Sequence, residues 1–302
     1  MPTGGTEGKC YAPCSGSPFL LRQKTTNALT GIHNMSKVSI IASRAVIARY
    51  NAGAWRVQKK KKNKAETAAY EAKHNLKAGT ASVSNDICDH PALKEIYKLQ
   101  ASARNDVHYR LTLPVADGGM RILAGAFQLE YAAKMGSIEQ QIKILVTQFL
   151  KDYPAEAASA PARLNGTYDA SQWPSVEVIA SKFYFIFRYE TVPTLPQWDE
   201  WMEESAAVAE EDLKARLATA VTTLAHSLAN GTRFNESLIT NLADICCLVG
   251  GLNLRDDPVI AKLAIEEAKL AASISPQEIR DPKSVKEAAA ARAAKIAGMF
   301  SL

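Results

Sequence analysis

The chain contains few of the sequence features that mark enzymes, metal-binding proteins or membrane proteins. It has no phosphate-binding G-x4-G-K-[ST] loop, no G-x-G-x-x-G turn after a predicted strand, no H-E-x-x-H motif and no paired C-x2-C. Its five cysteines are odd in number and irregularly spaced, which is typical of reduced thiols rather than of a disulfide framework. The sequence therefore predicts no cofactor and no metal site, and it favours a non-enzymatic protein.

Long apolar runs and a secretion signal are missing as well. No stretch approaches the roughly 20 apolar residues that span a bilayer, and the first residues lack the order of a signal peptide. We therefore expect a cytoplasmic protein with no membrane partner. Residues 1–35 are rich in Gly, Ser, Thr and Pro without a sustained period, and they are predicted to form a disordered extension, with Met35 as a second candidate start. Cys10 and Cys14 form a C-x3-C pair there, but no second pair of zinc ligands lies nearby.

Positive charge is concentrated in one part of the chain. The net charge is +5. Residues 36–110 hold 15 Lys and Arg against 6 Asp and Glu, which gives +9, and residues 1–35 hold 3 against 1, which gives +2; the remainder therefore carries −6. A basic N-terminal segment joined to a mildly acidic body indicates contact with a polyanion.

The densest basic cluster follows a tryptophan. Lysines at this density favour a phosphate backbone through the release of counterions, and an aromatic ring beside them can stack on a base. The predicted nucleic-acid-binding residues are Trp55, Arg56, Lys59, Lys60, Lys61, Lys62 and Lys64. The alternative is a solvated basic loop with Trp55 packed inward, and the sequence alone does not choose between the two.

Helical periodicity dominates the chain after Pro91, and the fold is predicted to be mainly α. Apolar residues recur at helical spacing over residues 93–111 and again over 123–153. Between these segments, Pro114 breaks helical geometry and adjacent glycines allow backbone angles closed to other residues. We therefore expect long antiparallel helices that pack together around a Pro/Gly corner. The corner residues are Arg104, Pro114, Asp117, Gly118, Gly119 and Arg121, of which Arg104, Asp117 and Arg121 are predicted to form a structural charge network that clamps the corner.

One segment has the pattern of a β-strand. Aromatic and β-branched residues alternate over residues 183–189, with Phe183, Phe185 and Phe187 on one side. We predict a small β element near residues 183–192 that forms a hairpin with a neighbouring segment. It should be covered or used at an interface, because an isolated exposed strand is an aggregation hazard. Residues 38–50 fit a strand and a helical face about equally well.

The predicted organisation has four segments. They are a disordered extension (1–35), a basic N-terminal segment (36–110), a helical core with the small β element (111–255) and C-terminal helices (256–302). No catalytic residue is predicted in them. His108 can be drawn with Asp106 and Asp117 as an acid/base cluster, but residues i and i+2 on a helix do not face each other.

Several short motifs along the chain carry a resemblance to a known family. They are Trp55-Arg56 with the lysines, Ala103-Arg104, Leu111-Thr112-Leu113-Pro114, Gly119-Met120-Arg121-Ile122-Leu123, Phe149-Leu150, Asp152-Tyr153-Pro154, Trp173-Pro174-Ser175, Phe183 and Val192-Pro193. In this order, over roughly residues 38–200, they resemble a family of uncharacterised helical proteins encoded by tailed phages and bacterial integrative elements. The family's corner is similar to T-L-P-W, an acidic-glycine turn and R-L-L-P; here Val115 stands in place of the Trp and Ala124 in place of the Pro. Family members are encoded near recombination genes and AAA-type ATPase genes, which implies work on DNA or with such a motor and assigns no chemistry.

Two functional hypotheses follow from these observations. The basic segment and its lysine cluster favour a non-enzymatic DNA-associated protein with single-stranded DNA as the expected ligand. The resemblance implies that this protein is phage-encoded and that it acts in phage replication or recombination. The long amphipathic helices and the aromatic strand favour instead an oligomeric structural or adaptor protein, and the resemblance implies a AAA-type ATPase as its partner.

Overall fold

The computed structural model describes most of the chain after residue 40. The described residues are 41, 43–60, 64–78, 80–81, 84–116, 118–165, 168–192, 199–229, 236–274 and 283–300. The predicted extension, residues 1–35, and three predicted site residues, Lys61, Lys62 and Asp117, lie outside them. Helices make up most of the described residues, so the prediction of a mainly α fold with a small β element is confirmed.

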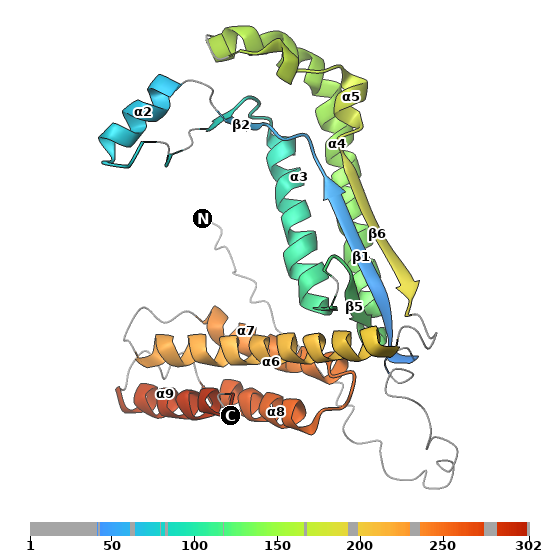
Figure 1. The fold of residues 1–302 in the computed structure, drawn as a ribbon, viewed down its shortest axis with the longest axis vertical. Coiled ribbons are helices and arrows are strands. Elements are labelled where there is room, and N and C mark those ends of the chain that lie inside the picture. Colours follow the sequence, from blue (N-terminus) through green and yellow to red (C-terminus); the bar gives the residue numbers. More distant parts are fainter. Residues whose placement is uncertain are drawn as a thin grey trace, which may run out of the picture. The chain divides into compact units, whose positions relative to one another are not determined.

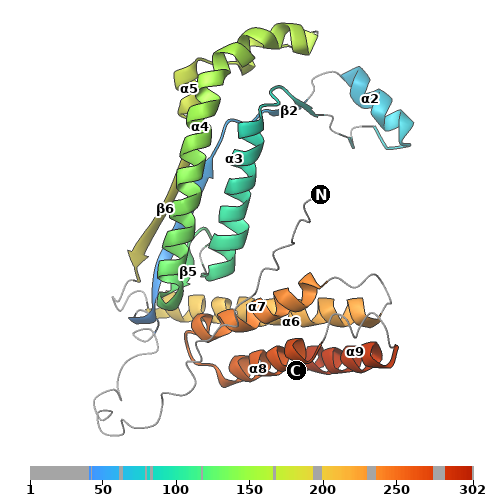
Figure 2. The ribbon, with the colours of Figure 1, turned by 180° about the vertical axis from the view of Figure 1, so that it is seen from behind.

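Four antiparallel strands form the main sheet, in the order β4-β5-β1-β6. The strands are β1 (Ala45–Gly53), β4 (Thr112–Pro114), β5 (Arg121–Ala124) and β6 (Tyr184–Thr191). Of residues 38–50, which fitted a strand and a helix about equally, residues 45–50 belong to β1 in the middle of the sheet, while residues 41, 43 and 44 are helical and the others lie outside the described residues. Figure 1 shows β1 and β6 side by side, and the reverse view in Figure 2 agrees.

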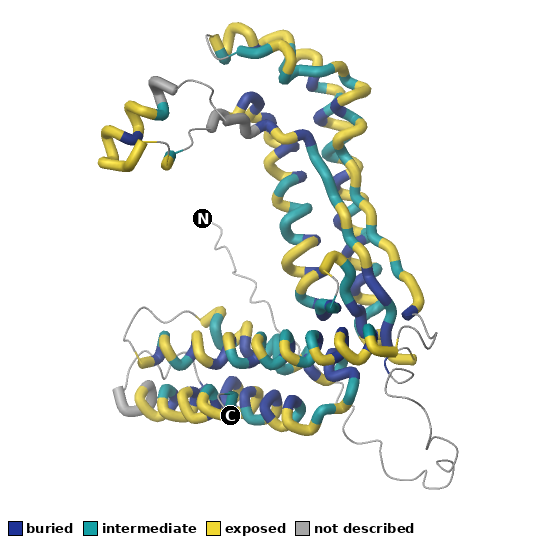
Figure 3. The backbone as a smooth tube through the Cα atoms, viewed as in Figure 1, coloured by how far each residue is buried: buried dark blue, intermediate teal, exposed yellow. Residues whose placement is uncertain are grey.

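Strand β6 has the alternation that its sequence predicts, but its pairing partner is not local. It pairs with β1 from Val46 opposite Thr191 to Gly53 opposite Tyr184. The predicted hairpin with a neighbouring segment is therefore wrong, because the core between sheet and helices favours a long-range pairing. Along β6, exposed and half-buried residues alternate (Figure 3), and the half-buried side, with Phe185 and Phe187, faces the helices.

The predicted Pro/Gly corner lies where it was expected, between two helical segments, but strands flank it. Pro114 ends β4 and Arg121 begins β5, and these two residues are opposite each other in an antiparallel pair. Gly119 has a φ of 100°, a left-handed conformation that glycine adopts without strain. The corner is thus the turn of a short β-hairpin formed by β4 and β5. Helical segments precede β4 and follow β5 in the chain.

The other described elements are either short or long. The short elements are β2 (Gln58–Lys60), β3 (Ser84–Asp86), α2 (Lys64–Lys73), η3 (Gly125–Phe127), η5 (Ala170–Gln172) and α5 (Val176–Ala180). The longer ones are α3 (Pro91–Ser102), the π-helix η2 (Ala103–Tyr109) that continues it, α4 (Gln128–Leu164), α6 (Asp199–Ala229), α7 (Ser237–Leu252), α8 (Pro258–Ser273) and α9 (Lys283–Gly298). Local signals set several starts: His90 Nδ1 accepts from the Ala92 N–H ahead of α3, and Asp257 Oδ1 accepts from the Val259 N–H ahead of α8.

The sheet is covered differently on its two faces. On one face Ala48, Leu123 and the half-buried side of β6 pack with α3, η2 and α4 around Tyr131 and Met135. On the other face the core is built with α6, α7 and α8, and it covers only the half of the sheet where β1 begins; its members include Ala45, Ile47, Leu113, Ile122, Met202, Leu213 and Leu252. Beyond that half, Arg49, Asn51, Tyr184 and Ile186 are exposed. A separate core joins α6, α7, α8 and α9.

Candidate functional site

The tryptophan of the predicted nucleic-acid interface is part of the core. Trp55 is only 5% exposed. Its ring lies 6.0 Å from that of Phe149, 5.6 Å from Tyr153 and 5.4 Å from Trp173, measured between centroids. The prediction that Trp55 stacks on a base is therefore wrong, because four aromatic rings that bury one another leave it no free face. The alternative, Trp55 packed inward, is what the fold contains.

The basic residues of the same cluster lie in three short elements. Arg56 is exposed directly after Trp55, Lys59 and Lys60 lie in β2, which pairs with β3, and Lys64 is the first residue of α2. Lys61 and Lys62 lie outside the described residues. The cluster is thus a peripheral hairpin and helix start, next to the core that holds Trp55.

Of the charge network predicted at the corner, the structure describes the two arginines. The Arg121 guanidinium donates from Nε to Thr112 Oγ1 at 2.6 Å and from Nη2 to the Thr112 carbonyl at 2.9 Å. Arg216 on α6 donates to the same carbonyl at 2.8 Å. Arg104 bonds instead to Asn105 Oδ1 at 3.3 Å and is exposed, and Asp117 lies outside the described residues. Arg121 therefore holds the hairpin through Thr112, because the paired strands β4 and β5 place that residue within its reach.

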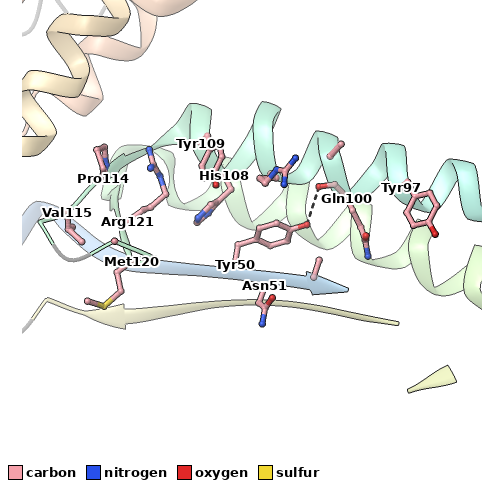
Figure 4. A pocket seen from close by; sticks show the side chains of 15 residues that line it. Tyr50, Asn51, Tyr97, Gln100, His108, Tyr109, Pro114, Val115, Met120 and Arg121 are labelled. Atoms are coloured by element: carbon pink, nitrogen blue, oxygen red, sulfur yellow. Dashed lines mark hydrogen bonds between the residues drawn. The ribbon is translucent and has the colours of Figure 1, made fainter. Parts of the chain in front are cut away.

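Arg104, Arg121 and the corner glycines do meet at one place, a cleft of about 530 Å³ between α3 with η2 on one side and β1 on the other. The turn residues Gly118 and Gly119 close one end of it. Figure 4 shows the helix side chains and Tyr50 pointing into this space, while Asn51 points away from the helix. The cleft exists because β5 pairs with β1 only from Ala45 to Ala48, so β1 continues on that edge without a partner strand from the described part of the chain.

One face of the helical segment forms the wall opposite β1. Tyr97, Ala101, Arg104 and His108 line the cleft and follow one another at intervals of four, three and four residues, which places them on the same face. Gln100 joins the two walls: its side-chain Nε2 donates to the Gly53 carbonyl at 2.9 Å, and its own carbonyl accepts from the Tyr50 hydroxyl at 3.2 Å (Figure 4).

The electrostatics of the cleft favour a negatively charged ligand. Arg104 and Arg121 both line it, and the described lining residues include no Asp or Glu. Burial, together with the nearby Arg216, lowers the pKa of Arg121, but a guanidinium stays charged at neutral pH. Its carbon lies 4.9 Å from the ring centroid of Tyr109, which fixes the side chain in a cation–π contact at the mouth of the cleft.

The titratable groups in the cleft do not form an acid/base pair. Burial, with a contribution from Arg121, lowers the pKa of His108 to about 4, so the ring is neutral at pH 7. Its Nδ1 lies 2.8 Å from the Tyr131 hydroxyl, and the Asp106 carboxylate accepts from the Ser102 hydroxyl at 2.7 Å. Burial raises the pKa of Tyr50 to about 12, so its phenol keeps its proton. The arrangement can bind and orient an anion with aromatic and hydrogen-bonding groups.

The tyrosines of this site were not predicted as site residues. Tyr50 and Tyr97 fit the apolar patterns of their segments, where a tyrosine most often packs in a core, and Tyr109 belongs to no predicted pattern or site. The four, three and four spacing of Tyr97, Ala101, Arg104 and His108 is a signal that was present in the sequence. The free edge of β1 had no such signal, since it depends on the length of its pairing with β5.

Comparisons with protein-family models, curated proteins and solved structures found no match to this chain. Among the described residues, no group of three or more His, Cys, Asp or Glu side chains could hold a metal ion. The helices in the described part of the chain include none that is long and apolar enough to cross a membrane.

Proposed function

We propose that this protein is a non-enzymatic nucleic-acid-binding protein whose ligand is single-stranded DNA, and that it is encoded by a phage or integrative element and acts in the host cytoplasm during replication or recombination. The observation that carries the proposal is the cleft, whose described lining residues include two arginines and three tyrosines and no carboxylate. Cationic side chains with aromatic rings are the combination that binds single strands through phosphates and bases.

The charge of the chain supports the same ligand. Most residues that line the cleft, Arg104 among them, belong to the +9 segment of residues 36–110, and Arg56 is exposed two residues before β2, the strand that contains Lys59 and Lys60. Because Trp55 is buried, the lysine cluster contributes positive charge but no aromatic contact. The aromatic contacts come from the tyrosines of the cleft. Sequence-independent attraction to phosphates and a local site for bases are separate contributions that a salt series can distinguish.

Fluorescence anisotropy with labelled oligothymidylate and a duplex of equal length, measured over a salt series, tests this proposal. Arg104→Ala removes one proposed phosphate contact. The hydrogen bond that it removes within the protein is that to Asn105. We expect three- to tenfold weaker binding and a salt slope smaller by about 0.7, the value for one phosphate of a single strand. Lys98→Ala is the matched control, because Lys98 lies on the same helix, outside the cleft, paired with Glu95.

The lysine cluster has its own variant. Alanine at Lys59, Lys60, Lys61, Lys62 and Lys64 together should flatten the salt slope further while the preference for single strands over duplex persists. An unchanged slope would remove the cluster from the interface. No binding to either DNA at low salt would overturn the proposed function.

A second candidate function, an oligomeric adaptor that works with a AAA-type ATPase, rests on the edge of the sheet. Strand β6 has no partner strand on its outer edge among the described residues, and Tyr184 and Ile186 are 43% and 40% exposed on its outer face. Such an edge favours association. Light scattering that gives a monomer at working concentration, with no ATPase captured, would reject this alternative.

A further inference from the structure

The unpaired edge of β1 gives the cleft a row of backbone groups. On its β6 side, β1 is paired from Val46 to Gly53. On its other side the pairing with β5 stops at Ala48, and no described strand continues along residues 49–53, a distance of about 13 Å, at whose end the Gly53 carbonyl accepts from Gln100 Nε2. Asn51 and Ala52 of this edge line the cleft, opposite Arg104. Backbone N–H and C=O groups along such an edge are directional hydrogen-bonding groups that a ligand can use.

An extended peptide and an unpaired nucleobase both carry donors and acceptors that suit a strand edge. The other groups in the cleft decide between them. Arg104 and Arg121 offer two cationic groups, and Tyr50, Tyr97 and Tyr109 line the same cleft, with the Tyr109 ring against the Arg121 guanidinium. A chain that repeats a negative charge and an aromatic ring in every unit fits this combination better than a peptide of uncharged side chains, whose only negative charge is its terminal carboxylate.

We propose that the open edge of β1 hydrogen-bonds the Watson–Crick edges of unpaired bases while Arg104 and Arg121 hold the adjacent phosphates. This inference rests on the proposed function, because it assigns a binding mode to the same cleft. In a duplex those base edges are already paired, so the cleft accepts single strands only. The small Ala52 side chain matters in this arrangement, because alternation places it on the side of β1 that carries Tyr50 and faces the helix.

The first test changes the ligand and leaves the protein intact. Labelled oligothymidylate is compared with an abasic strand of the same length and the same number of phosphates, over the same salt series. We expect the abasic strand to bind at least tenfold more weakly with an unchanged salt slope, because phosphate contacts remain and base contacts are lost. Equal affinity for the two strands would overturn the base contact while leaving single-strand binding in place.

The second test changes the edge itself. Ala52→Val adds two methyl groups beside the edge inside the cleft, and Ile186→Val is the control, a strand-compatible change on β6 at the position paired with Asn51 and outside the lining of the cleft. We expect Ala52→Val to weaken oligothymidylate binding at least fivefold and abasic binding less than twofold, with Ile186→Val within twofold of the native protein for both. Thermal unfolding checks that both variants fold. Equal effects of Ala52→Val on the two strands would contradict base recognition at this edge.

The outcomes separate the two proposals. Absence of binding to both strands at low salt overturns the proposed function and this inference together. In that case a hexapeptide of valine and threonine with a free terminal carboxylate is the next probe, and its binding, abolished by Ala52→Val, would identify the cleft as a peptide groove. Binding of oligothymidylate in strong preference to the abasic strand, sensitive to Ala52→Val, supports both.

Discussion

The His108 ring nitrogen Nδ1 lies 2.8 Å from the Tyr131 hydroxyl, in the buried layer between η2 and α4. The imidazole is 4% exposed, and the Tyr131 side chain is fully buried. Either tautomer can complete this hydrogen bond, since a hydroxyl both donates and accepts. Protonation would place a positive charge on a buried ring near Arg121, which is unfavourable. The free energy of unfolding should therefore depend on pH.

Stability should fall on acidification through this histidine. The pKa of His108 is about 4 in the folded chain, below its ordinary value of 6.5. The contribution is fully present above pH 6.5 and is lost as pH falls towards 4, by up to about 3 kcal/mol. Urea unfolding at pH 7.0, 5.5 and 4.5 measures it. His108→Gln, which cannot titrate here, should show a shallower loss across this window, and identical slopes in the two proteins would refute the assignment.

A buried carboxyl in the α7 and α8 layer should have the opposite pH dependence. Glu267 is 0% exposed, its Oε1 has no hydrogen-bond partner in the described structure, and its Oε2 accepts from the Cys246 thiol at 3.9 Å. Burial raises its pKa from 4.5 to about 8. The stability from the neutral form is present below pH 4.5 and is lost as pH rises through 8, by roughly 5 kcal/mol at most.

The variant Glu267→Gln imitates the protonated form and should therefore unfold at higher urea concentration than the native chain at pH 8, with little difference at pH 4.5. Glu266→Gln is its control, because the neighbouring carboxylate is outside the core and pairs with Lys269. If both substitutions changed the urea midpoint equally at pH 8, burial of Glu267 would not be the cause.

Replacement of Trp55 should affect the fold before it affects binding. Trp55→Ala removes a ring surrounded by Phe149, Tyr153 and Trp173 and is expected to lower the free energy of unfolding by about 3–5 kcal/mol. Trp55→Phe keeps an aromatic ring there and should bind oligothymidylate as the native protein does. A stable Trp55→Ala protein that has lost DNA binding would instead restore Trp55 as a stacking residue.

Two adjacent glycines near the end of α7 form a matched pair. A Cβ at Gly251 would lie 2.5 Å from a ring carbon of Phe127, whereas a Cβ at Gly250 would meet no atom within 4 Å. Gly250→Ala should stabilise the protein by about 0.5–1 kcal/mol through helix propensity. Gly251→Ala should destabilise it by about 1–3 kcal/mol because the ring must move. Thermal unfolding of both variants decides it, and equal shifts would show that Phe127 adapts freely.

Features that depend on residues adjacent in the sequence, such as helix starts and strand alternation, could be predicted. Helix starts at Pro91 and Pro258 follow from caps and proline positions, and the alternation of β6 follows from its aromatic residues. The cleft depends on relations that no local pattern contains. The position of β1 between β5 and β6, and the end of its β5 pairing at Ala48, are set by packing between distant segments.

The roles predicted for single residues also depend on contacts between segments that are distant in the sequence. The lysines that follow Trp55 in the sequence are compatible with a ring that stacks on a base. Only the aromatic rings that α4 and the segment before α5 place around Trp55 show that it belongs to the core. Arg104 and Arg121 were placed together at the corner from their flanking motif, and they do line one cleft. Their predicted link through Asp117 remains a prediction, because that residue lies outside the described part of the chain.

The π-helix η2 makes the number of residues in one wall of the cleft as important as their identity. A π-helical turn contains one residue more than an α-helical path would need. Deletion of one residue within Ala103–Tyr109 would allow this segment to close into an α-helix, and every later side chain would turn by about 100° relative to α3. Tyr109 would then leave Arg121, and His108 would leave Tyr131. Homologous chains that share this cleft should therefore tolerate substitutions here far better than insertions or deletions.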